Sequence, residues 1–135
     1  MNREEFFAFP DRIIVPVLVK EMNFTFHVRS ISAAEKAKWE MEIIRINNSA
    51  KSGNAVELTK DRMLTAHERL VELATCNEDG SAFFKPGDAP EIGKKNSNVV
   101  ATLYEAAAKL SGITKEDIED LGKNSLSASE EVLSA

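Results

Sequence analysis

The stretch Ala66–Phe84 (AHERLVELATCNEDGSAFF) places the strongest constraint on how this chain can fold. Its first part has apolar residues at helical spacing, so that Leu70 and Leu73 lie on one buried face. A tight turn is expected at positions 77–80, because Gly80 can adopt the positive φ that ends a helix. The apolar segment Ala82–Phe84 then folds back. The pattern predicts a structural corner with no catalytic group exposed on it.

A second pattern, near the N-terminus, has the period of β-strands. Ile13–Val19 is apolar on both faces, and Phe24–Val28 alternates apolar with polar residues across a turn at Lys20–Asn23. Pro16 lacks an N–H, so its strand belongs at a sheet edge or turns the proline nitrogen away from the ladder. An antiparallel hairpin follows, and it must pack on the helices or on another chain, because a lone hairpin is marginally stable.

The remaining regular structure is predicted to be helical. Ser32 and Glu35 form a capping box, which predicts a helix over Ala33–Asn47 with a loop over 48–54. Further helices are expected over 54–75, over 97–110 with Ser97 as its cap, and over 114–121, with a loop at 85–96. Gly112 has the position of a helix C-terminal glycine. The predicted fold is α+β: an N-terminal antiparallel β-hairpin packed on a mainly helical domain of three to four helices.

Length and composition predict one domain over 1–122 and a flexible acidic tail over 123–135. Positions 112–135 carry six acids and two bases, which suits either a solvated tail or a contact for a basic partner. The net charge of −5 argues against nucleic-acid binding. The longest apolar run has seven residues, too few for a bilayer, and no signal peptide is evident. We expect a cytoplasmic protein without a membrane partner.

The sequence shows no motif for catalysis, metal binding or phosphate binding. His27 and His67 have no second ligand at metal-binding spacing, and no glycine-rich phosphate loop is present. The single cysteine, Cys76, cannot form an internal disulfide and is expected to be a packed core thiol. The sequence predicts no catalytic site, no metal and no cofactor, and hence no enzyme.

Aromatic residues near the N-terminus are the first candidates for a partner surface. Phe6, Phe7 and Phe9 lie within four positions of one another. Large aromatic side chains are seldom left in water, so they either cap the core or fill a groove of a partner. We expect the core, with the partner's groove as the alternative.

The helix predicted over Ala33–Asn47 carries the second candidate surface. Trp39, Ile43 and Ile46 form an apolar stripe opposite a first stripe that contains Met41. A helix of a small domain usually buries one face, so either the hairpin or a second subunit covers the second stripe. The candidate residues for self-association or partner binding are Trp39, Ile43, Ile46, Phe6 and Phe7.

The order of several motifs resembles the tail assembly chaperones of siphophages, the long-tailed bacteriophages. The resemblance runs from the hairpin to about Lys123. It consists of the hairpin, the segment Arg29–Glu35, a long helix into Asp79-Gly80, then Phe84, then Leu103–Thr114. The family often has Gly-Gly in the hairpin turn and asparagine before the later glycine, where this chain has Glu21-Met22-Asn23 and Ser111.

The resemblance implies a non-enzymatic, non-structural protein of tail morphogenesis in the host bacterial cytoplasm. Such a protein binds the tape measure protein, keeps it soluble, and associates with itself in a ring or a spiral. A longer, frameshifted form helps to recruit the tail tube protein. The alternative from another functional class is a small adaptor or regulatory domain that binds one globular partner.

Overall fold

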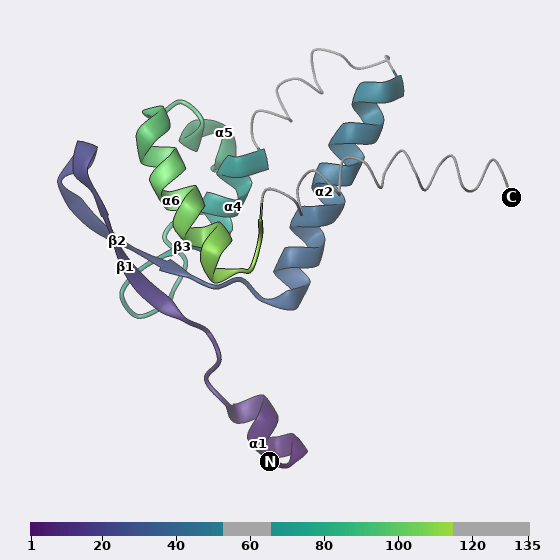
Figure 1. The fold of residues 1–135 in the computed structure, drawn as a ribbon, viewed down its shortest axis with the longest axis vertical. Coiled ribbons are helices and arrows are strands. Elements are labelled where there is room, and N and C mark those ends of the chain that lie inside the picture. The colour runs from purple at the N-terminus through teal and green to yellow at the C-terminus, as the bar shows by residue number, and fades with distance from the viewer. Residues whose placement is uncertain (53–65, 115–135) are drawn as a thin grey trace, which may run out of the picture.

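A computed structural model describes residues 1–52 and 66–114, with side chains except at positions 46–52 (Figure 1). The start of the second predicted helix, the helix predicted after Thr114, the acidic tail and the Ile46 side chain lie outside the described residues. The architecture is α+β, with a small antiparallel sheet against a cluster of helices. The predicted fold class is confirmed.

The sheet contains the predicted hairpin and one strand that we did not predict. Strands β1 (Ile14–Val19) and β2 (Phe24–Arg29) are antiparallel, and a short 3₁₀ turn, η1 (Lys20–Met22), joins them. Strand β3 (Thr75–Cys76) pairs with β2, so the order is β1-β2-β3. Because β1 is therefore an edge strand, it accommodates Pro16 as expected.

Helix α2 (Ala33–Ser52) begins where the sequence predicted and ends later. Its capping box is present, since the Ser32 N–H donates to Glu35 Oε1 at 2.8 Å and the Glu35 N–H donates to Ser32 Oγ at 3.1 Å. The loop predicted from position 48 is wrong at its start. Relative to Ala, Asn and Ser in a helix interior cost only a fraction of a kcal/mol of helix stability. The polar run after Ile46 therefore does not end the helix.

Three further helices form the body beside the sheet: α4 (Ala66–Ala74), α5 (Ala89–Ile92) and α6 (Ser97–Leu110). α4 packs against both α5 and α6, and α6 packs against β1 and β2. The core is built from buried apolar residues on all of these elements, among them Val19, Val28, Leu70, Val71, Val99, Leu103 and Ala107.

The ends of α6 are determined by local hydrogen bonds. The N-cap is Asn96, whose Oδ1 accepts from the Asn98 N–H at 2.8 Å, so the prediction of Ser97 as the cap is wrong by one residue. At the C-terminus Gly112 has a φ of 67°, and the Ile113 N–H donates to the Ala108 carbonyl at 2.8 Å. The predicted role of Gly112 is confirmed.

The predicted corner after α4 is confirmed. Gly80 has a φ of 88°, and its N–H donates to the Asn77 carbonyl at 2.9 Å. The chain then folds back, because the Phe83 N–H donates to the Thr75 carbonyl at 3.2 Å. Arg29 fastens the corner to the hairpin, since its Nη1 donates to the Gly80 carbonyl at 2.8 Å.

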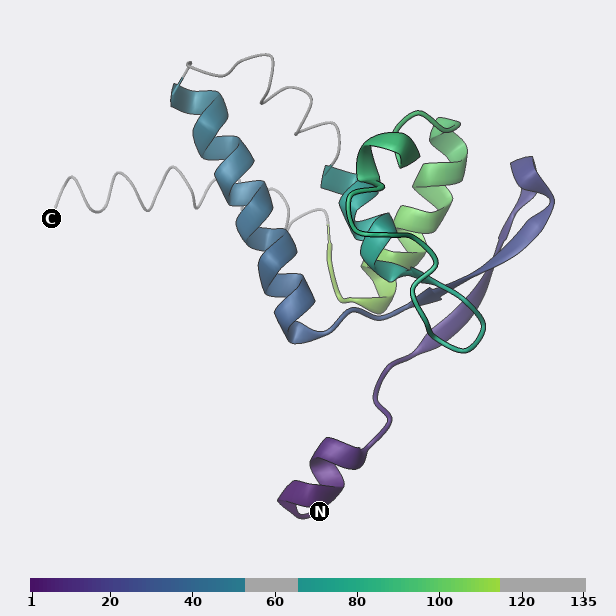
Figure 2. The ribbon, with the colours of Figure 1, turned by 180° about the vertical axis from the view of Figure 1, so that it is seen from behind.

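The N-terminal segment does not join the core. Residues 3–8 form a short helix, α1 (Arg3–Ala8), that projects from the body in both views (Figures 1 and 2). Every residue from 1 to 14 is exposed. The expectation that Phe6, Phe7 and Phe9 cap the core is wrong, because α6 and not the N-terminal segment packs on β1.

Candidate functional site

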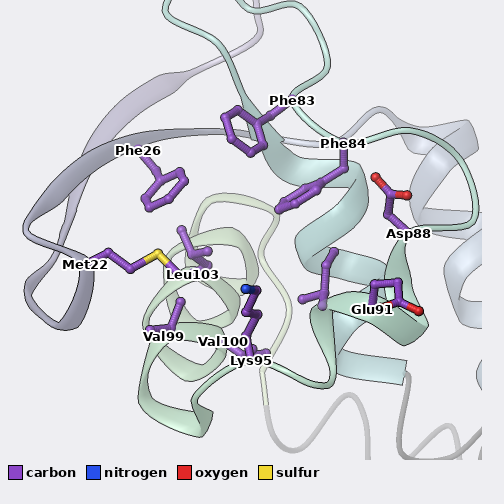
Figure 3. Close-up of a pocket in the computed structure, with 11 residues that line it drawn as sticks. Met22, Phe26, Phe83, Phe84, Asp88, Glu91, Lys95, Val99, Val100 and Leu103 are labelled. Carbon is purple, nitrogen blue, oxygen red and sulfur yellow. The ribbon is translucent and has the colours of Figure 1, made fainter.

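The surface contains an apolar groove of about 400 Å³ between the hairpin, the segment after the corner, α5 and α6 (Figure 3). Its size is within the range of pockets that bind ligands or apolar side chains of partners. The groove is lined by Met22, Phe26, Phe83, Phe84, Asp88, Glu91, Ile92, Lys95, Val99, Val100 and Leu103.

One wall of the groove is aromatic. Phe26 on β2 faces Phe83 with ring centroids 5.6 Å apart, and Phe83 contacts Phe84 at 4.9 Å, both edge to face. Phe24 extends the row toward the hairpin turn, 4.8 Å from Phe26. The corner creates this row, because it brings two residues far along the sequence against the second strand. Such a row offers large, rigid apolar area to a partner.

The opposite wall comes from α5 and α6. Ile92 on α5 and Val99 and Leu103 on α6 are buried and present apolar atoms to the groove. The loop before α5 is held by Glu72 of α4, whose Oε1 accepts from the N–H groups of Gly87 and Ala89, each at 2.9 Å. This wall is therefore fixed to the helical body.

Charged side chains lie at the rim. Asp88 Oδ2 accepts from the Lys85 N–H at 2.9 Å, and Glu91 forms an ion pair with Lys94 at 3.1 Å. Lys95 makes no ion pair with any described residue, and Figure 3 shows its side chain beside the apolar residues of the groove. A segment bound in the groove could therefore place a carboxylate near the Lys95 ammonium.

Trp39, Ile43, Phe6 and Phe7, the candidate residues whose side chains the structure describes, do not line this groove. Trp39 and Ile43 are 2% and 7% exposed, and the Trp39 Nε1 donates to the Ala66 carbonyl of α4 at 2.9 Å. Helix α4 of the same chain thus packs against the part of the stripe formed by Trp39 and Ile43, for which we expected either the hairpin or a second subunit. Phe6 and Phe7 lie on the projecting α1 and are 64% and 69% exposed.

Sequence reasoning missed the groove itself, apart from its Phe83 and Phe84, which we had placed directly after the corner. Phe26 was predicted as a strand residue, and Leu103 as part of a helical stripe. Both predictions describe the right element, but neither shows that the surface between the elements is left open. That depends on the tertiary arrangement of four separate segments.

Cys76 and His67 are side chains that could act as a nucleophile or a base, and each has a packing role in the structure. Cys76 is 2% exposed, and burial raises the pKa of its thiol, which favours the unreactive protonated form. His67 stacks on Tyr104 with ring centroids 4.1 Å apart, and burial raises the pKa of that phenol. Among residues 1–52 and 66–114, no group of three His, Cys, Asp or Glu side chains could hold a metal, and no helix could cross a membrane.

Comparison with known proteins gives one informative match. No family model matches the sequence, and no curated protein matches it significantly. A solved structure, that of the bacteriophage HK97 tail assembly chaperone, aligns with a TM-score of 0.56 at 16% sequence identity. The alignment covers 79% of this chain and 94% of that chain. The two chains share a fold.

The shared fold agrees with the resemblance noted from sequence motifs. The alignment takes in nearly all of the tail assembly chaperone and most of this chain, so the likeness is not confined to a small motif. At 16% identity it concerns the fold alone.

Proposed function

We propose that this protein is a tail assembly chaperone of a long-tailed bacteriophage, which binds the tape measure protein and keeps it soluble during tail assembly. The observation that carries the proposal is an open aromatic groove on a fold shared with the HK97 tail assembly chaperone. A chaperone of this kind needs an exposed apolar surface and no catalytic group.

The groove suits the apolar face of an amphipathic helix. Helix-in-groove recognition places apolar side chains at helical spacing into a hydrophobic channel. Here the aromatic row of Phe26, Phe83 and Phe84 forms one side of the channel, and the apolar face of α6 forms the other. A tape measure protein, which is long and largely helical, offers many such faces in succession, so many copies could coat one client.

The remaining features of the proposal follow from the same role. Copies of the protein associate with one another in a ring or a spiral, and a longer frameshifted form recruits the tail tube protein. The protein acts in the cytoplasm of the host bacterium and is not an enzyme. Transient coating requires contacts that release as tube subunits polymerise, which suits a small apolar groove better than a large permanent interface.

Co-expression with the tape measure protein from the same genome tests the proposal. We expect the soluble fraction of that client to rise when the wild-type protein is present and to fall again with Phe83→Ser. Phe83 is 44% exposed, so its replacement removes a groove wall with little loss of core packing. Met41→Ser is the matched control, because Met41 is 63% exposed on α2 and does not line the groove.

Two results would oppose the proposal. If the wild-type protein leaves the solubility of the client unchanged, it is not a chaperone for that client, and the adaptor hypothesis becomes the better one. If Phe83→Ser and Met41→Ser reduce solubility equally, the groove is not the binding surface. Melting curves of both variants show that each is folded.

A further inference from the structure

The N-terminal arm, residues 1–12, carries exposed apolar side chains, and Arg12 at its end forms an ion pair with Glu35 at 2.6 Å. Phe6, Phe7 and Phe9 are 64%, 69% and 58% exposed, although they are among the largest apolar side chains of the protein. The arm is locally ordered, because Asn2 and Glu5 form a capping box on α1. An isolated helix of six residues is marginal in water, so a docking partner would stabilise it.

The groove is an exposed apolar surface that the aromatic residues of the arm could cover. It presents an aromatic row in which Phe24 and Phe83 are 54% and 44% exposed. Phenylalanine rings pack well edge to face, and the rings of Phe6 and Phe7 are already held edge to face, with centroids 5.3 Å apart. An aromatic arm therefore matches the wall that it would cover.

Charge gives the arm a preferred orientation. Glu4 and Glu5 lie in the first turn of α1, and Lys95 beside the groove has no ion pair among the described residues. Arg3, which pairs with Glu4 at 3.7 Å within the arm, carries the charge opposite to that of Asp88 and Glu91 at the rim. The arm thus carries both the apolar and the charged groups that the groove can receive.

We propose that the N-terminal arm of one copy docks in the apolar groove of a second copy. The arm leaves the sheet at the Ile14 end of β1, whereas the groove includes Met22 at the opposite, turn end of the hairpin. One copy thus has a free arm at one end and a free groove at another. Contacts of this kind are heterologous and continue from copy to copy, as a ring or a spiral requires.

This inference rests on the self-association included in the proposed function and identifies the surfaces that produce it. It also adds a regulatory consequence, because the arm and the client helix occupy the same groove. The ring or spiral is therefore the form of the free protein, in which arms cover the grooves, and the tape measure protein displaces the arms when copies bind along it. A synthetic peptide of residues 1–12 should accordingly compete with the client for the groove.

Sedimentation velocity of the full chain tests the arm directly. We expect wild-type protein to sediment as larger species as its concentration rises, and Phe6→Ser/Phe7→Ser to remain a monomer. The arm is outside the core, so this variant should melt at the wild-type temperature. Removing two anchor residues should raise the dissociation constant by at least about tenfold. Met41→Ser, which loses exposed apolar area elsewhere, should associate like the wild type.

A mixing experiment tests the exchange between copies. Phe6→Ser/Phe7→Ser has an intact groove, and Phe83→Ser has an intact arm, so each alone should be monomeric. Mixed together, one arm meets one groove, and a 1:1 dimer that grows no further should form. The charge pairing has its own test: Lys95→Glu should weaken association, and Glu4→Lys in the same chain should restore it.

Three outcomes would overturn the inference. The wild-type chain could be monomeric at high concentration, the arm variant could associate like the wild type, or the mixture could stay monomeric although it contains one intact arm and one intact groove. None of these outcomes bears on the solubility of the client in co-expression, so a failure here and a failure of the proposed function are distinguishable.

Discussion

Arg29→Met is the substitution whose effect on stability can be worked out most fully from the structure. The Arg29 side chain connects the hairpin to both ends of the corner. Its Nη1 donates to the Gly80 carbonyl at 2.8 Å, and its Nε and Nη2 donate to the Leu73 carbonyl at 3.3 and 3.1 Å. Methionine keeps a long apolar stem but has no donor, so the substitution removes these hydrogen bonds and retains most of the packing.

The magnitude follows from the two carbonyl groups that lose their donor. A hydrogen bond to a charged group contributes about 1.5–3 kcal/mol when buried, and these are part-buried, so we take about 1–1.5 kcal/mol for each carbonyl. Leu73 is in the last turn of α4, where carbonyls lack an intrahelical partner, so helix packing does not compensate. The total is about 2–3 kcal/mol, which corresponds to a fall of roughly 8–12 °C in melting temperature for a chain of this size.

Thermal denaturation followed by circular dichroism measures this change. Arg3→Met is the control, since the Arg3 side chain is 76% exposed on α1, and it should shift the melting temperature by less than about 2 °C. If Arg29→Met melts within about 2 °C of the wild type, the corner is not held by Arg29 and the reasoning is refuted.

Three further predictions test the local structure. Although burial opposes it, hydrogen bonds from Ser32 hold the pKa of Glu35 below its ordinary value, so Glu35 stabilises the fold above its unfolded pKa. That contribution is lost as the pH falls through the folded pKa, so Glu35→Gln should lower the melting temperature at pH ~7 and have little effect at pH ~3. Gly80→Ala should destabilise more than Gly112→Ala: both glycines have positive φ, but only at Gly80 does an added Cβ meet a side chain, at 3.1 Å. Trp39→Phe should cost about 1 kcal/mol in urea denaturation, because it removes one hydrogen bond.

The local rules of helix and turn geometry predicted much of the fold. The Ser32–Glu35 capping box, the turn at Gly80 and the helix end at Gly112 all depend on the residue at one position and its near neighbours. The hairpin was also predictable, because its alternation and turn are contiguous in sequence. These features need no knowledge of the rest of the chain.

The predictions that were wrong concern features that depend on contacts between segments far apart in sequence. Thr75 and Cys76 form a strand only because β2 lies beside them, and two residues are too few to show a period. The stripe of Trp39 and Ile43 was correctly seen as apolar, but its cover, α4, comes from about 30 residues later. A sequence pattern shows that a face is buried and does not show which element buries it.

The groove and the N-terminal arm, the two surfaces of our proposals, were also hard to predict from sequence. The groove exists because β2, the corner, α5 and α6 leave a space between them, which no single periodicity reveals. The exposure of Phe6 and Phe7 on α1 was likewise a minority expectation, because aromatic residues near a terminus usually find the core. Both surfaces become visible only when every other apolar residue has been placed.

The central claim is that many copies coat one long client, and the mass of the complex tests it most directly. The protein would be co-purified with segments of the tape measure protein of increasing length, and the mass of each complex measured by light scattering. Our account predicts that the number of bound copies rises in proportion to segment length and falls with Phe83→Ser. A fixed stoichiometry of one copy at every length would contradict it and would identify an adaptor.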